Sequence, residues 1–226
     1  MKLGVLFSGG KDSTYALWKA LSYGYDVKCL ISILSENKNS FMFHTPSISR
    51  VKIAARAIDL PLIHRKTIGK EEEELKDLEE AVMKAIKKYS IQGIVTGTVE
   101  SVYQASRIQR ICDKLGLELF NPLWQKNQIE LLKDIIRDGF DVRIVGVAAY
   151  PLTNKYLGKK IDKDFVAEFS DLMKSDKINP AGEGGEYESF VLNGPIFKDK
   201  LEIIRFNDYG EKHSWAREIR IRRIRK

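Results

Sequence analysis

The sequence predicts an α/β protein with a parallel sheet of five or six strands, helices on both faces of that sheet, and a smaller C-terminal α+β domain. Short apolar, β-rich runs alternate with helical patterns over the first 149 residues, and this alternation is typical of a parallel sheet covered on both sides. A glycine-rich turn, Ser8–Ser13, joins the first run to the first helical pattern. The composition changes near Pro151, so we expect one domain over residues 1–149 and a second over 150–226.

Six runs are strand candidates, and five helical patterns lie between them. The strand candidates are residues 2–7, 27–34, 60–67, 93–98, 117–123 and 141–149. The helical patterns are residues 13–24, 46–58, 71–89, 103–116 and 128–139. In the last pattern, apolar residues recur at helical spacing at Ile129, Leu132, Ile135 and Ile136.

Local signals mark several helix ends. Thr45 followed by Pro46 predicts a capped helix start with proline at its first position. The acidic run Glu71–Glu74 predicts another helix start, where negative charge favours the helix dipole. Gly116 and Gly139 each follow a helical pattern, as C-terminal caps do.

The C-terminal part changes character. Residues 152–175 predict a short helical region, and residues 178–197 are rich in glycine and acid. Residues 201–226 predict two strands around a turn at Asn207–Gly210.

The net charge of +7 is concentrated at the C-terminal end, where the last twelve residues hold six basic residues and one acidic residue. One interpretation is a solvated strand in which Ile219 and Ile221 face inward while Arg220 and Arg222 face out. The other is a contact with RNA or with an acidic protein surface.

Composition sets limits on the class of protein. The chain has 226 residues, of which 43% are hydrophobic and 31% are charged, as is ordinary for a soluble globular protein. No apolar run approaches the ~18 residues of a membrane span, and the first residues lack the pattern of a signal peptide. We therefore expect a cytoplasmic protein. Cys29 and Cys112 are expected to be buried apolar residues, and the three isolated histidines do not indicate a zinc site.

The stretch Ser8-Gly9-Gly10-Lys11-Asp12-Ser13 has the features of a phosphate-binding loop. It follows the first predicted strand and opens the first helix, which places it at the carboxyl edge of the sheet, where ligands bind. The glycines let backbone N–H groups approach an anion, and the helix N-terminus adds positive potential. The simpler alternative is a tight strand–helix turn capped by Asp12 or Ser13.

Each side chain of this loop has an expected task. Ser8 and Ser13 can donate hydroxyls to phosphate oxygens, and Lys11 adds positive charge. Asp12 would repel phosphate unless a cation lies between them, so it predicts bound Mg²⁺.

At these residues the chain resembles the N-type ATP pyrophosphatases, a PP-loop branch of the adenine nucleotide alpha hydrolase-like fold, which is Rossmann-like. Further along, Gly93–Ser101 resembles the strand and T-G turn that face the nucleotide in that branch. The blocks Tyr103–Trp124 and Asn179–Phe197 resemble those of the diphthine–ammonia ligases, the second block being the specific one. Val102 departs from the pattern, because many family members have Asp there.

The resemblance implies a reaction and a set of substrates. Diphthine on translation elongation factor 2, ATP and ammonium would give diphthamide, AMP and pyrophosphate. ATP would be cleaved between its α and β phosphates, and the loop would hold the leaving pyrophosphate. Adenylation is needed because a free carboxylate would have to expel oxide when ammonia attacks it.

The resemblance also implies roles for the acidic loop, which is the part of the glycine- and acid-rich stretch 178–197 that carries Glu183, Glu186 and Glu188. Diphthine carries its carboxylate beside a trimethylammonium group. Glu183, Glu186 and Glu188 could attract that cation or ammonium, and one of them could accept a proton from ammonium. The ring of Tyr187 could lie against the methyl groups. These roles are not assigned individually, and the alternative is a glycine-rich connection whose acids are solvated.

Three more residues are candidates for nucleotide binding. Gly97 follows a buried strand and would permit close approach of adenine or ribose. Gln104 and Arg107 lie at the start of the next helix and can point toward the nucleotide, or can belong to a surface helix with a salt bridge. Trp124 and His44 are expected to be packing or loop residues.

Two other functions are compatible with the same loop. One is a tRNA-modifying adenylating ligase whose basic tail binds RNA; the acidic block and the absence of a cysteine pair count against it. The other is a non-catalytic ATP-binding or ATP-sensing module. A second copy of the chain, forming a homodimer, is a further candidate partner, and no membrane contact is expected.

Overall fold

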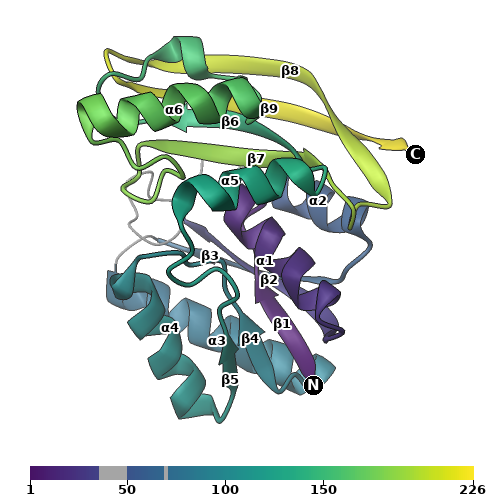
Figure 1. The fold of residues 1–226 in the computed structure, drawn as a ribbon. Helices are drawn as coiled ribbons and strands as arrows, with labels where there is room; N and C mark the ends of the chain where they lie inside the picture. The colour runs from purple at the N-terminus through teal and green to yellow at the C-terminus, as the bar shows by residue number, and fades with distance from the viewer. Residues whose placement is uncertain (36–49, 69–70) are drawn as a thin grey trace.

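A computed structural model describes residues 1–35, 50–68 and 71–226 (Figure 1). The predicted cap at Thr45 and Pro46, and His44, lie outside the described residues. In the described part of the chain, no helix is long and apolar enough to cross a membrane.

The first sheet is parallel and has five strands in the order β3-β2-β1-β4-β5, as the sequence predicted. Its strands and helices are β1 Lys2–Leu6, α1 Lys11–Ser22, β2 Asp26–Ser35, α2 Val51–Ile58, β3 Leu62–Thr67, α3 Glu71–Tyr89, β4 Gly93–Val95, α4 Val102–Leu115 and β5 Glu118–Phe120. Crossover helices lie between successive strands, which is the connection that parallel neighbours require.

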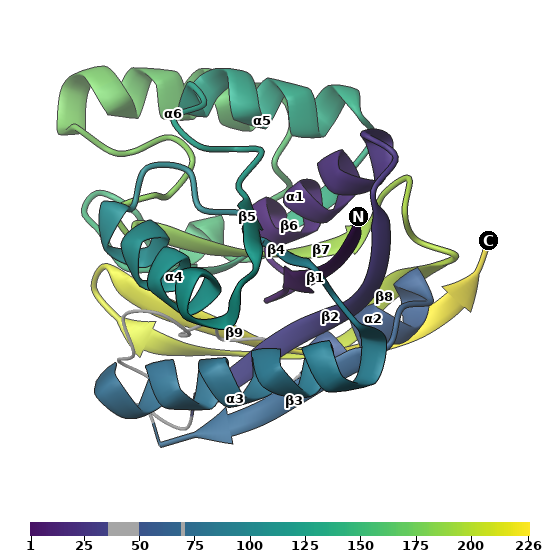
Figure 2. The ribbon, with the colours of Figure 1, turned by 90° about the horizontal axis from the view of Figure 1, so that it is seen from below.

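Helices cover both faces of this sheet (Figure 2). On one face, Leu3 and Val5 of β1 join a core with α1 and α2. On the other, Ile31 and Ile94 join a core with α3 and α4 that also contains Cys29 and Cys112. Both cysteines are buried and free, as expected. Burial raises the pKa of Cys29 to about 12 and that of Cys112 to about 11.

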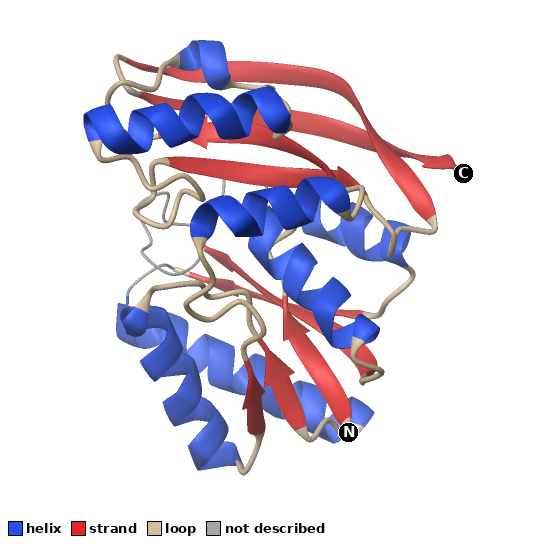
Figure 3. Ribbon diagram, viewed as in Figure 1, coloured by secondary structure: helices blue, strands red, loops and turns tan. Residues whose placement is uncertain are grey.

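The second sheet is antiparallel and has four strands in the order β7-β6-β9-β8, as Figure 3 shows above the first sheet. Its elements, with the helices beside it, are α5 Gln128–Arg137, β6 Asp141–Val147, η2 Asn154–Tyr156, α6 Lys163–Asp176, β7 Tyr187–Asn193, β8 Asp199–Glu211 and β9 Ser214–Arg225. The smaller α+β unit that the sequence predicted is therefore present.

The strand β6 belongs to this second sheet, although the sequence grouped it with the first 149 residues. It pairs antiparallel with β7 and β9. An apolar run preceded by a helix suits a parallel strand equally well, so local pattern does not decide which sheet it joins.

The predicted turn at Asn207–Gly210 is wrong. These residues lie inside β8, and the chain reverses at Lys212 and His213. Gly210 faces the backbone of Ser214 and Trp215, where a Cβ would lie 2.2 Å from the Ser214 oxygen. Glycine at position 210 therefore allows β8 and β9 to approach closely. Lys212 has the positive φ of 50° that a two-residue turn needs.

Most other local predictions are confirmed. The acidic run opens α3, and Gly116 is the C-cap of α4 with a φ of 64°. Gly139 follows the C-cap of α5 with a φ of 80°. In β9, Ile219 and Ile221 are buried while Arg220 and Arg222 are exposed.

Candidate active site

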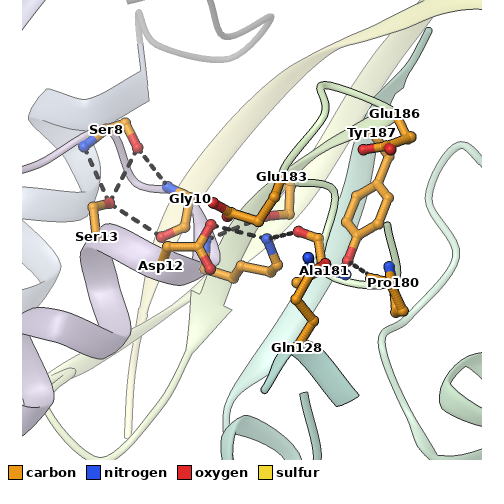
Figure 4. Close-up of polar contacts among 12 residues, drawn as sticks. Ser8, Gly10, Asp12, Ser13, Gln128, Pro180, Ala181, Glu183, Glu186 and Tyr187 are labelled. Carbon is orange, nitrogen blue, oxygen red and sulfur yellow. Dashed lines mark hydrogen bonds and ion pairs between the residues drawn. The ribbon is translucent and has the colours of Figure 1, made fainter. Parts of the chain in front are cut away.

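The loop Ser8–Ser13 lies between β1 and α1, at the carboxyl edge of the parallel sheet. Gly10 is the N-cap of α1, and no side chain caps it. The hydroxyls of Ser8 and Ser13 are 3.1 Å apart, and the N–H of Gly10 donates to Ser8 Oγ over 3.2 Å (Figure 4). Neither Asp12 nor Ser13 caps the helix, so the predicted cap is wrong; Ser13 Oγ instead donates to the Gly10 oxygen within the turn, and phosphate binding by the loop stays a prediction.

This loop also covers the free edge of β7. The N–H of Val191 donates to the Gly9 oxygen over 2.9 Å, and the N–H of Lys11 donates to Ser189 Oγ over 3.2 Å. Gly9 has a φ of 81°, and a Cβ there would lie 2.8 Å from the ring of Phe190. The close contact thus requires glycine, and it joins the two sheets at the loop.

Lys11 and Asp12 form an ion pair at the start of α1. Lys11 Nζ lies 2.8 Å from Asp12 Oδ2 and also donates to the Ala181 oxygen. The Lys11 side chain is buried. Asp12 Oδ1 is buried and has no hydrogen-bond partner among the described residues. An orphaned carboxylate oxygen at this position is suited to a cation ligand.

Glu183 lies beside this pair. The N–H of Glu100 donates to Glu183 Oε2 over 3.1 Å. Burial raises the pKa of Glu183 to about 7, Asp12 and Glu100 add to that rise, and Lys11 opposes it. The carboxyl group is thus poised to exchange a proton near neutral pH.

Glu186 holds the acidic loop together. Its carboxylate accepts from the N–H of Asn179 over 3.0 Å, from Asn179 Nδ2 over 2.6 Å and from the N–H of Gly184 over 2.8 Å. The side chain is buried. These contacts favour a structural role in shaping the loop, because three donors already occupy the two oxygens.

Tyr187 is a buried residue whose ring lies beside Lys11. Its hydroxyl donates to the Pro180 oxygen over 2.8 Å, and its ring packs edge-to-face on Phe165 and Phe169. Lys11 Nζ lies 5.2 Å from the ring centroid. Burial raises the pKa of the hydroxyl well above its ordinary value. The ring is therefore packed inside the protein, where it supports the Lys11 ammonium.

Glu188 lies in β7 between Tyr187 and Ser189, so its side chain is on the opposite face of that strand. Its neighbour on β6 is Gly146. Burial raises the pKa of Glu188 to about 8. The three acids that the sequence grouped together thus occupy three different environments.

Of the nucleotide candidates, Gly97 lies on the β4–α4 connection against the phosphate loop, while Gln104 and Arg107 lie in α4. A Cβ at Gly97 would lie 2.6 Å from the carbonyl carbon of Asp12 and 2.7 Å from the nitrogen of Ser13, so glycine is required for packing on α1. The N–H of Gln104 donates to Ser101 Oγ, the N-cap of α4. The guanidinium of Arg107 stacks 3.4 Å from the ring centroid of Tyr103. A contact of these residues with nucleotide stays a prediction.

Sequence reasoning missed Gln128, the first residue of α5. Its Oε1 accepts from the N–H of Ala181 over 2.9 Å, and its Nε2 donates to Glu100 Oε2 over 3.0 Å (Figure 4 shows the residue beside Ala181). It therefore links the acidic loop to the β4–α4 connection. The available signal was only a polar residue at a helix start, which is common on protein surfaces.

Comparison with known proteins matches both halves of the chain to one family. Residues 1–119 match the diphthamide synthase N-terminal domain and residues 127–226 match the diphthamide synthase C-terminal domain.

Relatives named diphthine–ammonia ligase match most of the chain, and two of them differ in how much of their own length is covered. The protein from Homo sapiens is 32% identical over 222 residues, which cover 90% of this chain and 83% of the relative. The protein from Schizosaccharomyces pombe is 34% identical over 223 residues, which cover 90% of this chain and 36% of the relative. The chain thus spans about a third of the fission yeast protein.

Among solved structures, one described as a predicted subunit of tRNA methyltransferase from Methanocaldococcus jannaschii aligns with a TM-score of 0.42 at 17% identity, over 86% of this chain and 98% of that chain. Similarity at this level carries no functional conclusion.

Proposed function

The chain belongs to the diphthamide synthase family, and we propose that it amidates diphthine on translation elongation factor 2. ATP and ammonium are the other substrates, and diphthamide, AMP and pyrophosphate are the products. The protein acts in the cytoplasm. The observation that carries the proposal is the direct contact between the phosphate loop and the acidic loop, made by Lys11 Nζ and the Ala181 oxygen.

That contact holds the phosphate loop against the loop that carries Glu183. The N-terminus of α1, with the glycine backbone of Ser8–Ser13, binds the pyrophosphate that leaves ATP. Glu183 lies next to Asp12 in the same cluster. A substrate carboxylate that attacks the α-phosphorus at this loop is therefore within reach of the Glu183 carboxyl group.

The reaction then runs in two balanced steps. An oxygen of the diphthine carboxylate bonds to the α-phosphorus as the bond to pyrophosphate breaks, which leaves an acyl adenylate. Ammonia next attacks the acyl carbon, the carbon–oxygen bond to AMP breaks, and the attacking nitrogen releases one proton to water as the amide forms. Glu183 accepts the proton that ammonium gives up, because its pKa near 7 leaves a substantial carboxylate fraction at neutral pH.

Magnesium fits the donor set at Asp12. The Oδ1 atom is buried without a hydrogen-bond partner among the described residues, and carboxylate oxygen is the ligand that this cation prefers. When bound, the cation would neutralise charge on the pyrophosphate that the loop holds. Asp12 would hold it, while Lys11 keeps the other carboxylate oxygen in place.

The remaining acidic-loop residues act on the shape of the site. Glu186 closes the loop by accepting three hydrogen bonds, and Tyr187 packs beneath Lys11. Buried side chains are poorly suited to contact with the trimethylammonium group. Glu188 lies on the other face of β7 from Tyr187, and burial raises its pKa to about 8, so a largely uncharged Glu188 is no better suited to that contact.

Incubation with ATP, Mg²⁺, ammonium and diphthine-bearing elongation factor 2 tests the proposal. The expected result is AMP formation that requires both the factor and ammonium. AMP formation that requires tRNA instead would support the tRNA-modifying alternative, and ATP binding without AMP would support a sensing module.

A further inference from the structure

The strand β8 is an open edge of the second sheet. It ends the strand order β7-β6-β9-β8 and, among the described residues, forms a ladder with β9 on one side only. Every residue from Ile204 to Lys212 is exposed. Ile204 is 49% exposed and Phe206 is 55% exposed. A long open edge with exposed apolar side chains is a template for pairing with another chain.

Two arginines stand opposite each other next to this edge. Arg205 of β8 and Arg220 of β9 are direct cross-strand partners, and both are exposed. Neither forms an ion pair or a side-chain hydrogen bond with any residue in the described part of the chain. Like charges at directly opposed positions destabilise a sheet, so an anionic group from outside would relieve this repulsion.

Two neighbouring arginines of the same hairpin, unlike Arg205 and Arg220, form ion pairs with carboxylates of β8. Arg222 lies 2.6 Å from Glu202, and Arg217 forms a two-pronged pair with Asp208 at 2.7 and 2.6 Å. The acids nearest to Arg205 on β8 are thus already paired. The hairpin has carboxylates of its own but leaves the Arg205 and Arg220 pair without one.

We propose that the open edge of β8 and the Arg205–Arg220 pair form a docking surface for an acidic segment of the protein substrate. The segment would add a strand to β8, lay apolar side chains on Ile204 and Phe206, and place a carboxylate between the two arginines. The inference rests on the proposed function, in which the group to be amidated is carried by a folded protein. Such a substrate must contact surface beyond the acidic loop.

A protein suits this surface better than RNA or a second copy does. The open backbone edge of β8 and the exposed Ile204 and Phe206 match the main chain and apolar side chains of a protein segment, which a phosphate backbone lacks. A second copy pairing through its own β8 would bring acids that arginines already hold. An acidic, partly apolar segment meets the free charge and the exposed side chains together.

Steady-state amidation of diphthine-bearing elongation factor 2 tests the proposal with R205E/R220E. We expect the KM for the factor to rise at least about tenfold, with kcat and the KM for ATP unchanged. The neutral variant R205Q/R220Q should show a smaller rise and guards against misfolding of the charge-reversed protein. K76E/K84E, with the same change of net charge on exposed residues of α3, should match the wild type.

The outcomes separate the two proposals. If the wild type does not amidate the factor, the proposed function fails. If the wild type is active and both arginine variants keep its KM, the docking surface is wrong. A variant that keeps its KM for the factor but loses binding to tRNA would assign the surface to RNA. Loss of a dimer in sedimentation with an unchanged KM would assign it to a second copy.

Discussion

The N–H of Glu100 donates a hydrogen bond to Oε2 of Glu183 over 3.1 Å, across 83 residues of sequence. The bond joins the β4–α4 connection of the first sheet to the acidic loop before β7. It holds the carboxyl group near Asp12, whose charge, with burial, raises the pKa of Glu183 to about 7. The hydrogen bond thus holds beside the phosphate loop the carboxyl group that we propose as proton acceptor.

Asp12 is expected to be essential for ATP cleavage. In D12N the amide keeps the size of the carboxylate but loses its charge, so cation affinity should fall and AMP formation should slow by about 100-fold or more. Titration with Mn²⁺ followed by electron paramagnetic resonance measures cation binding without turnover. D171N, at a carboxylate that is 82% exposed on α6, is the control. An unchanged Mn²⁺ affinity in D12N would remove Asp12 from the cation site.

Gln128 is expected to position the acidic loop. In Q128A the N–H of Ala181 loses its acceptor and Glu100 loses a donor, so Lys11 and Glu183 lose their fixed geometry. We expect kcat to fall by about 10- to 100-fold with little change in the KM for ATP. The pH midpoint of kcat should also move, because the surroundings of Glu183 change.

A matched set of variants isolates this effect. Q128E keeps the acceptor for Ala181 but sets a carboxylate against Glu100 in place of a donor, so it should not recover the rate. K133A, at an exposed residue of α5, should match the wild type. A Q128A protein with a lower melting temperature but an unchanged kcat and pH profile would reduce Gln128 to a structural residue.

Glu188 is expected to make the free energy of unfolding depend on pH. Its pKa rises from an ordinary 4.5 to about 8 on folding, so folding is favoured while the group is protonated and this advantage is lost as pH rises from the unfolded pKa through the folded one. E188Q is uncharged throughout. The unfolding free energy of E188Q minus that of the wild type, measured in urea, should be at least about 1 kcal/mol larger at pH 8 than at pH 5. A difference from wild type that does not vary with pH would show that Glu188 ionises normally.

Much of the fold could be predicted because its local signals agree with one another. The strand–turn–helix context of Ser8–Ser13 fixed the place of the phosphate loop, and alternation along the first 120 residues fixed the parallel sheet. The sheet that β6 joins was beyond prediction, since it depends on partners far along the chain. The reversal at Lys212 was missed because glycine and asparagine signals inside β8 suggested an earlier turn.

The candidate site was predictable in content but not in roles. The acidic residues of the loop could be named from the sequence, but the role of each depends on its tertiary contacts. Glu186 meets N–H groups of its own loop, and Glu183 meets Glu100. Strand alternation could have separated Glu188 from Tyr187, had the start of β7 been known. The role of Gln128 could not be predicted from the sequence, because its partners Ala181 and Glu100 are brought together only by folding.

The most direct measurement of the central claim follows ¹⁵N from ammonium into elongation factor 2 in a single turnover, with AMP and pyrophosphate counted in parallel. For the wild type we expect one AMP for each ¹⁵N amide formed. For E183Q we expect pyrophosphate release to persist, while incorporation of ¹⁵N slows by about 100-fold or more, because the proton acceptor for ammonium is gone. Equal rates of ¹⁵N incorporation in the two proteins, or AMP formed by the wild type without any amide, would contradict the account.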